Sequence, residues 1–425
     1  MKNYVLKGNI CYSRSKDEIC IVENGYVVCE NGRSAGVYAV LPEVYAPFPC
    51  FNYEDRMIIP GLVDLHVHAP QYPFRGLGMD LELIDWLNTH TFVEEARYAD
   101  LEYAGRAYEI FTEDLRNSET TRACIFGTIH SSATLLLMEK LEAAGLKAYV
   151  GRVNMDRNSP GYLCEKSTRK SAEDTEKWIL DSQGFQHVRP ILTPRFTPSC
   201  TDELLERLSG LQKKYGLPVQ SHLSENLGEI EWVKELCPGT AFYGKTYDRY
   251  GLFGSQGASI MAHCVHSGEA EMELMRKRGV FAAHCPESNV NLASGAAPVK
   301  RYLEKGIKTG LGTDIAAGSS LSVFKAMVMA IQCSKLRWRL YDQSLAPLTV
   351  EEVFYLATKG GGEFFGNVGS FEEGYAFDAV VMDDSSVRQP RRLKVRERLE
   401  RLVYLSGECR MAAKFIDGRV IFREN

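Results

Sequence analysis

The central part of the chain alternates two patterns of apolar and polar positions. From Ile58 onward, short apolar runs of strand length are each followed by a stretch in which apolar residues recur at the period of a helix. Helices are predicted, for example, at residues 202–215 and 269–277. Eight strands are predicted, at residues 61–66, 123–129, 147–152, 188–193, 218–222, 259–263, 280–284 and 308–313. Eight βα units in about 315 residues are typical of an α/β fold of the (β/α)8 TIM-barrel type.

A long interruption separates the first two predicted strands, at residues 69–122. Connections that follow barrel strands form the face of the barrel at which catalytic groups collect. We therefore expect this segment to add helices over the mouth of the barrel and to close over a bound ligand.

Both ends of the chain have the pattern of antiparallel strands. Each contains a dipeptide that favours a type I′ turn, Asn24-Gly25 near the start and Asp417-Gly418 near the end, because these residue types tolerate positive φ. The runs that flank the two turns are residues 19–23, 26–29, 414–416 and 419–422. A further strand is predicted at residues 376–382. These strands predict a small β-sandwich domain to which both termini contribute.

The change of pattern divides the chain into three segments. Residues 1–58 and 375–425 are predicted to form the β-domain, and residues 59–374 the barrel inserted between its two halves. A length of 425 residues suits this division, because α/β barrels often exceed the usual domain size as one unit.

Composition and charge narrow the class of protein. Hydrophobic residues make up 45% of the chain and charged residues 25%, which is ordinary for a globular protein. The 50 basic and 55 acidic residues give a formal charge of -5, which disfavours nucleic acid or an anionic membrane as the main partner. The 12 cysteines include no CxxC pair, and no apolar stretch suits a leader or a membrane span. We expect a cytoplasmic protein that acts on a small molecule.

Histidines end several of the predicted strands. His66 and His68 close the first strand, where residues two apart face the same side. His222 and His263 end the fifth and sixth strands, and Asp314 follows the eighth. Since the carboxyl ends of all barrel strands open onto one face, these side chains are expected to meet there. Neutral imidazoles and a carboxylate suit zinc or ferrous iron, with one position left for a water whose pKa the ion lowers.

Several roles within this set stay open from the residues alone. Asp314 is either a further ligand or the base that accepts the proton of the water, and His263 either binds the metal or, as we favour, orients the water. Glu225 lies three residues after His222, a spacing that fits a general acid/base as well as an acidic residue at a helix start. His130 and His284 also lie close to strand ends, where a structural role and a site role are equally supported.

Seven segments carry a resemblance to known proteins. The chain resembles the amidohydrolase superfamily in residues 60–68 (PGLVDLHVH), 221–225 (SHLSE), 262–263 (AH), 284–289 (HCPESN) and 312–314 (GTD). Within that superfamily, residues 69–72 (APQY) and 193–196 (TPRF) resemble the guanine deaminases. The signatures of other hydrolytic zinc enzymes, HxE followed by PCxxC and HExxH, are absent from the sequence.

The resemblance implies a reaction and a set of site residues. It implies a homodimeric enzyme that hydrolyses guanine to xanthine and ammonia with one zinc ion per subunit, since the predicted fourth strand does not end in the lysine typical of binuclear relatives. It implies His66, His68, His222 and Asp314 as zinc ligands, His263 near the water, Glu225 as proton shuttle, and Gln71, Arg195, Phe196 and His222 as substrate-binding residues.

Arg195 has a chemical reason to contact guanine. A guanidinium group can donate to O6 and N7 of guanine together, whereas adenine presents an amino donor at the same edge. Phe196 can stack on or meet the edge of the flat base. The alternatives are a surface ion pair for Arg195 and a core position for Phe196. Two other functions stay open, a related amidohydrolase for another amino- or chloro-substituted heterocycle, and a metal-free scaffold protein.

Overall fold

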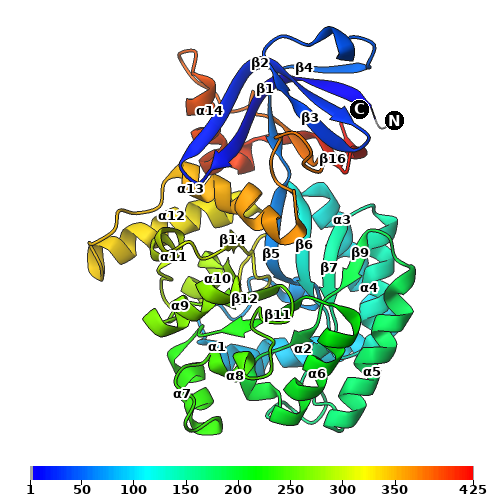
Figure 1. Ribbon diagram of the computed structural model, residues 1–425, viewed down its shortest axis with the longest axis vertical. Coiled ribbons are helices and arrows are strands. Elements are labelled where there is room, and N and C mark those ends of the chain that lie inside the picture. The colour runs from blue at the N-terminus through cyan, green and yellow to red at the C-terminus, as the bar shows by residue number, and fades with distance from the viewer. Residues whose placement is uncertain (1–2, 425) are drawn as a thin grey trace.

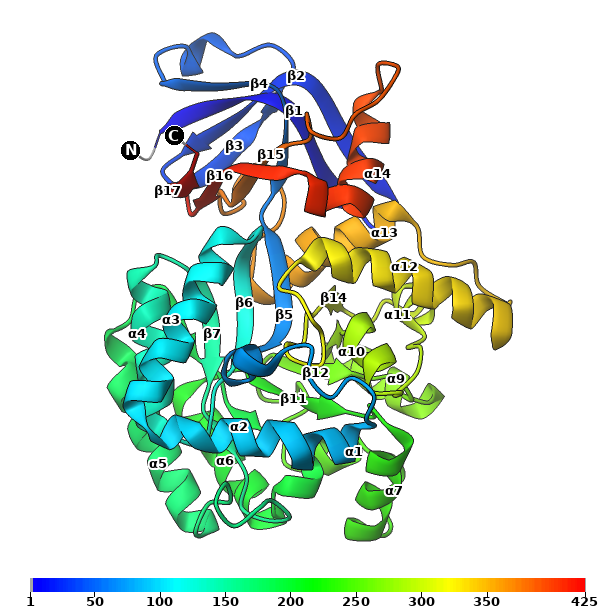
Figure 2. The same cartoon turned by 180° about the vertical axis from the view of Figure 1, so that it is seen from behind.

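The fold has two parts, a β-rich part and a larger part of parallel strands and helices (Figures 1 and 2). It is known from a computed structural model that describes residues 3–424. Both termini lie in the β-rich part (Figure 1). Within residues 3–424, no helix combines the length and the continuous apolar character needed to span a bilayer.

Two parallel sheets form the centre of the larger part, as the α/β prediction requires. One sheet contains β5 (Leu62–His68), β6 (Thr120–Phe126), β7 (Lys147–Gly151) and β9 (Val188–Pro190). The other contains β11 (Val219–Leu223), β12 (Ser259–His263), β13 (Phe281–His284) and β14 (Thr309–Leu311). A parallel bridge between Leu192 and Val219 links the sheets on one side. On the other side, the Asp314 N–H donates to the His66 carbonyl over 2.8 Å.

Two of these strands differ from the predicted ones for identifiable reasons. The predicted strand at 188–193 is interrupted, because Pro190 and Pro194 have no N–H for the ladder; β10 (Thr193–Pro194) pairs separately with β8 (Val153–Asn154). Strand β6 begins at Thr120, three residues before the predicted start. Its first residues are polar but buried, and Arg122 there forms an ion pair with Asp378 over 2.6 Å.

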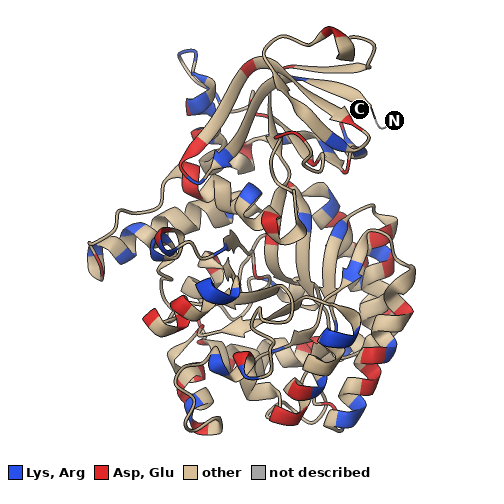
Figure 3. Ribbon diagram, viewed as in Figure 1, with Lys and Arg blue, Asp and Glu red and all other residues tan. Residues whose placement is uncertain are grey.

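Helices connect the parallel strands and surround them. The predicted helix at 202–215 is confirmed as α6, which the Thr201 side chain caps and which ends at Gly216 with φ 65°. The predicted helix at 269–277 is confirmed as α9, one residue longer. The helices after β6 are α4 (Ser131–Ala143), α5 (Thr168–Asp181), α6 (Asp202–Tyr215), α7 (Leu227–Leu236), α8 (Lys245–Asp248), α9 (Glu269–Arg278), α10 (Pro286–Asn291), α11 (Val299–Lys305), α12 (Val323–Leu340) and α13 (Val350–Tyr355). Figure 3 shows acidic and basic residues interspersed on the outer helices.

The interruption at 69–122 contains extra helices, as predicted. These are α1 (Leu83–Trp86), α2 (Phe92–Ala96) and α3 (Leu101–Asn117), joined by short 3-10 and π-helical turns. Figure 2 shows α2 and α1 running as one helical stretch across the larger part of the molecule. Leu83, Trp86 and Leu87 from this stretch are buried.

Strands from both ends of the chain share one sheet. Its order is β17-β16-β15-β4-β1-β2-β3, and β4 pairs with β15 across more than 300 residues of sequence. All these strands are hydrogen-bonded into a single sheet of the described residues, where the sequence predicted a sandwich of two. The strands are β1 (Tyr4–Ser15), β2 (Glu18–Glu30), β3 (Arg33–Tyr38), β4 (Cys50–Pro60), β15 (Ala379–Asp383), β16 (Arg410–Ile416) and β17 (Arg419–Arg423), and α14 (Val395–Leu405) accompanies them.

One of the two predicted turns is confirmed and the other is wrong. Asp417-Gly418 joins β16 to β17 with φ values of 47° and 71°, as a type I′ turn requires. Asn24-Gly25 lies inside the continuous strand β2. Asn24 has positive φ there because the β1–β2 pairing shifts register opposite Asn9, whose side chain accepts a hydrogen bond from the Asn24 N–H over 3.0 Å.

Candidate active site

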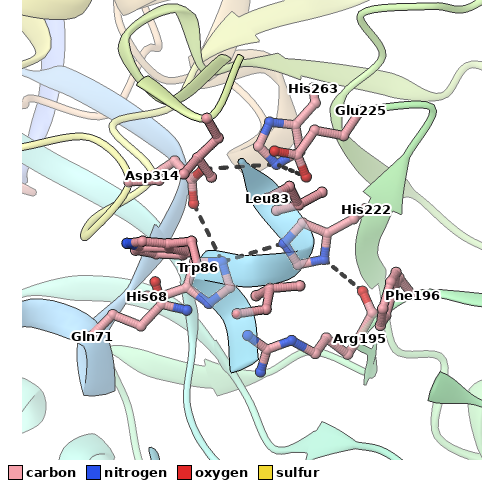
Figure 4. Close-up of a pocket in the computed structure, with 13 residues that line it drawn as sticks. His68, Gln71, Leu83, Trp86, Arg195, Phe196, His222, Glu225, His263 and Asp314 are labelled. Carbon is pink, nitrogen blue, oxygen red and sulfur yellow. Dashed lines mark hydrogen bonds and ion pairs between the residues drawn. The ribbon is translucent and has the colours of Figure 1, made fainter. Parts of the chain in front are cut away.

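A cavity lies at the carboxyl ends of the parallel strands (Figure 4). It is lined by every residue that the sequence assigned to the site except His66, whose Nε2 lies 3.2 Å from that of the lining residue His68. Hydrophobic residues from the helices after β5, from the end of α10 and from the segment after β14 complete the lining. The lining residues are His68, Gln71, Leu83, Trp86, Leu87, Arg195, Phe196, His222, Glu225, His263, Leu292, Asp314 and Ala317.

One side of the cavity, the metal wall, consists of His66, His68, His222 and Asp314. His68 Nε2 lies 3.2 Å from His66 Nε2 and 3.3 Å from His222 Nε2. Asp314 Oδ1 lies 3.1 Å from His66 Nε2 and 3.4 Å from His68 Nε2. A tetrahedral ion with bonds of about 2.0–2.1 Å separates its ligand atoms by about 3.3–3.4 Å. The spacing of these atoms therefore fits a single divalent metal ion.

The protonation of the metal wall suits the same ion. Burial lowers the pKa of His66, and burial together with the neighbouring histidines lowers the pKa of His68 and His222 well below the usual value. Burial alone would raise the pKa of Asp314, but the nearby histidines outweigh it and lower that pKa well below its usual range. The wall thus offers neutral imidazoles and a carboxylate, the forms in which these groups bind metals.

Backbone contacts hold the metal-wall side chains in place. His222 Nδ1 donates to the Arg195 carbonyl over 2.6 Å, which leaves the Nε2 lone pair directed at the cavity. The buried Asp64 carboxylate accepts from the His66 N–H over 3.1 Å and from the Thr313 N–H over 3.0 Å. Burial, opposed by these hydrogen bonds, raises the pKa of Asp64 to about 6. Asp64 thereby ties the end of β5 to the segment that carries Asp314.

Glu225 faces the cavity rather than capping a helix. Glu225 directly precedes α7 at its start, but the capping box of that helix uses Asn226 and Glu229 and not Glu225. The Glu225 carboxylate lies 3.5 Å from His263 Nε2 and accepts from Ser294 Oγ over 3.4 Å. Burial and the charge of Asp314 raise the pKa of Glu225 well above its usual value. A carboxyl group held in this way can donate and accept a proton at the cavity surface.

His263 bridges the two carboxylates of the cavity. Its Nε2 lies 3.8 Å from Asp314 Oδ2 and 3.5 Å from Glu225 Oε2. Its Nδ1 is 2.9 Å from Asn289 Oδ1 on α10, which fixes the ring. His263 also belongs to two groups of three residues whose potential ligand atoms all lie within 4.8 Å of one another, His66–His222–His263 and His263–Cys285–Asp314.

The opposite side of the cavity, the recognition wall, consists of Gln71, Arg195 and Phe196. Arg195 is only 3% exposed, so the alternative of a surface ion pair is wrong; its partner is the buried Glu95, with Nη1 and Oε2 2.6 Å apart. Phe196 lies against Trp232 with its ring centroid 6.0 Å away and the planes at 76°. Figure 4 shows the Arg195 side chain extending along the cavity below His68 and His222.

Sequence reasoning missed the residues behind the two walls, above all Glu95. Its partners Gln71 and Arg195 are 24 and 100 residues away, so no spacing pattern pointed to it. His130 and His284 do not line this cavity. His130 precedes α4 and lines another hollow, and His284 is buried at the end of β13, where burial and His263 lower its pKa to about 3.

The chain matches a model of known proteins over most of its length. Residues 57–421 match the amidohydrolase family. The guanine deaminase of Escherichia coli is 34% identical over 387 residues, which cover 88% of this chain and 85% of that protein. The guanine deaminase of Dictyostelium discoideum is 37% identical over 376 residues, which cover 86% of this chain and 83% of that protein.

A solved structure resembles the whole chain. The crystal structure of a guanine deaminase from C. acetobutylicum, with guanine bound in its active site, has a TM-score of 0.96 and 45% sequence identity. The match covers 99% of this chain and 100% of that one.

Proposed function

The chain belongs to the amidohydrolase family, and from this premise we propose that it is an enzyme that hydrolyses guanine to xanthine and ammonia. The observation that carries the proposal is the likeness over the full chain to a guanine deaminase that was crystallised with guanine. The cavity supports it with chemistry of its own, because one wall suits a metal ion and the other presents the Arg195 guanidinium.

The reaction replaces the amino group at C2 of guanine by an oxygen from water. The water oxygen forms a bond to C2, the C2–N bond breaks, and the amino group leaves as ammonia. Glu225 accepts a proton from the attacking water and passes it to N3 of the ring. It then accepts the second proton from the oxygen now bonded to C2 and gives it to the amino group, which leaves as ammonia. Its buried position favours this role, because the raised pKa makes the carboxylate a stronger base towards water and lets it hold the proton during transfer.

We assign the metal to the four residues of the metal wall and propose zinc as the ion, with ferrous iron as the alternative. When bound, a divalent ion would supply a Lewis acid that lowers the pKa of the attacking water. Asp314 accepts a hydrogen bond or a proton from that water, and His263 orients it. Family membership makes metal dependence the expectation, and the neutral imidazoles support it.

Base recognition is assigned to the recognition wall. The Arg195 guanidinium donates to O6 and N7 of guanine, Gln71 pairs with a polar edge of the base, and Phe196 packs against the ring. The His222 ring also borders the base. The aliphatic and aromatic side chains of Leu83, Trp86 and Leu87 cover it and exclude water.

We further propose an architecture and an assembly. The two parallel sheets close into one (β/α)8 barrel of residues 59–374, supported by the backbone hydrogen bond from Asp314 to His66 and the bridge from Leu192 to Val219. Residues 1–58 and 375–425 form the accompanying β-domain, supported by the pairing of β4 with β15. A homodimer and a cytoplasmic location stay predictions.

The test is turnover by the purified protein together with its metal content. We expect equimolar ammonia and xanthine from guanine, and one equivalent of zinc by elemental analysis. Adenine, cytosine and chloro- or amino-triazines serve as competing substrates, and faster turnover of one of them would identify a related amidohydrolase for that heterocycle. A protein that binds no metal and turns over none of these compounds would support the scaffold alternative.

A further inference from the structure

A buried carboxylate connects the two polar residues of the recognition wall. Glu95, on α2, is 1% exposed. Its Oε2 accepts from Arg195 Nη1 over 2.6 Å, and its Oε1 accepts from Gln71 Nε2 over 3.0 Å. We infer that Glu95 is the positioning residue for base recognition, an inference that rests on the proposed function and names the group that orients its substrate contacts.

The direction of the hydrogen bonds requires a carboxylate at this position. The Ala316 N–H donates to Gln71 Oε1 over 3.0 Å, which turns Gln71 Nε2 towards Glu95. Arg195 has only donors, so residue 95 must accept from two sides at once. A glutamine there accepts from Arg195 but meets the Gln71 amide with a second donor. If Gln71 turned round to accept from it, the Ala316 N–H would lose its partner instead.

This arrangement fixes what the recognition wall offers a ligand. With Nη1 committed to Glu95, the Arg195 fork is held so that its other N–H groups can donate, and one N–H of Gln71 is left as well. The wall therefore presents donors, which match the acceptors O6 and N7 of guanine and oppose the amino group of adenine. Glu95 also balances the buried charge of Arg195, whose guanidinium carbon lies 5.2 Å from the centre of the Phe92 ring.

Glu95 acts through its partners, because it is not among the residues that line the cavity. Its role is thus distinguishable from that of a residue that touches the base. Loss of positioning weakens contacts made in both the ground state and the transition state, so it raises KM and leaves kcat nearly unchanged.

The test compares Glu95→Gln with the matched control Glu94→Gln. Glu94 precedes it on the same helix and is also buried, but its partners are Tyr103 and Arg97. For Glu95→Gln we expect KM for guanine to rise about 10- to 100-fold, with kcat within about threefold of the wild type. The dissociation constant of xanthine, measured by calorimetry, should rise by the same factor, whereas Glu94→Gln should change neither constant by more than about threefold.

A double variant separates positioning from folding. In Gln71→Glu/Glu95→Gln the glutamine accepts from Arg195 and donates to the new glutamate, which also accepts from the Ala316 N–H. Every group therefore has a partner again, and the number of carboxylates is unchanged. We expect its melting temperature to return to within about 2 °C of the wild type while KM stays raised, because the donor at residue 71 is lost.

Each outcome decides the inference. An unchanged KM in Glu95→Gln, an equal rise in Glu94→Gln, or recovery of KM together with melting temperature in the double variant would overturn it. If Glu95→Gln does not fold, Glu95 has a structural role instead and the inference is overturned. Wild-type turnover of guanine, measured alongside, tests the proposed function separately.

Discussion

The two walls of the cavity are built in different ways. The metal wall takes its side chains from the ends of β5 and β11 and from Asp314, three residues after the end of β14. The carboxylate behind it, Asp64, accepts mainly from backbone N–H groups. The recognition wall uses longer side chains from the 3-10 helix after β5 and from the residues that follow β10. The carboxylate behind that wall, Glu95, accepts from the side chains of Gln71 and Arg195 and comes from a helix inserted between two strands.

The difference shows how much positioning each kind of side chain needs. A histidine at a strand end has few rotatable bonds, and its direction follows from the sheet. An arginine or glutamine outside a strand keeps a single direction only if a buried partner holds it. We therefore expect the metal wall to depend on its own residues and the recognition wall to depend on its support.

The largest effect is expected from breaking the metal wall. His66→Ala should remove most of the bound metal and lower turnover of guanine by about 10³-fold or more, because the Lewis acid is lost. If the walls are independent, the affinity for xanthine should fall by less than about tenfold. Elemental analysis and calorimetry on the same preparation check both statements. Unchanged metal content would count against this set of ligands.

Glu225→Gln should slow the chemical step without affecting either wall. A glutamine fills the same volume but cannot transfer the proton, so kcat should fall by about 10²- to 10⁴-fold. Metal content and xanthine affinity should stay near those of the wild type, since Glu225 belongs to neither wall. A kcat close to the wild-type value would remove Glu225 from the proton path.

Arg195→Ala should weaken the recognition wall directly. Charge-assisted hydrogen bonds are each worth about 1.5–3 kcal/mol, so KM for guanine should rise about 10- to 100-fold while metal content is unchanged. Arg195→Lys keeps the charge but not the planar fork, and we expect it to recover only a small part of the loss. Full recovery in Arg195→Lys would show that charge rather than geometry recognises the base.

The sequence predicted the metal wall better than its surroundings, and the reason is physical. Apolar runs mark buried strands, and a histidine at the end of such a run is visible in the sequence, so His66, His68 and His222 meet as expected. Glu95 could not be predicted in this way, because in the sequence a buried glutamate with distant partners does not differ from any other polar residue of a helix. The turn predicted at Asn24-Gly25 is wrong for a related reason, since a bulge within β2 needs the same positive φ as a turn.

The smallest effect is expected behind the metal wall, at Asp64. Asp64→Asn keeps one side-chain oxygen, and Asp64 Oδ1 alone accepts from the backbone N–H groups of His66 and Thr313. The other oxygen accepts from the Thr313 hydroxyl over 2.5 Å, and that hydroxyl can turn to accept from the new amide instead. Metal content and kcat/KM should therefore stay within about threefold of the wild type.

Asp64→Ala is the matched control, because it removes all three acceptor contacts at once. It should lower metal affinity by about 10- to 100-fold, the usual cost of losing a group that orients metal ligands. Glu95→Gln changes no more atoms than Asp64→Asn, yet we expect a much larger loss of kcat/KM. The reason is that neither Arg195 nor Gln71 can rotate to accept a hydrogen bond from the new amide. An equal loss of kcat/KM in Asp64→Asn and Glu95→Gln would mean that negative charge supports both walls. The contrast between backbone and side-chain support would then be wrong.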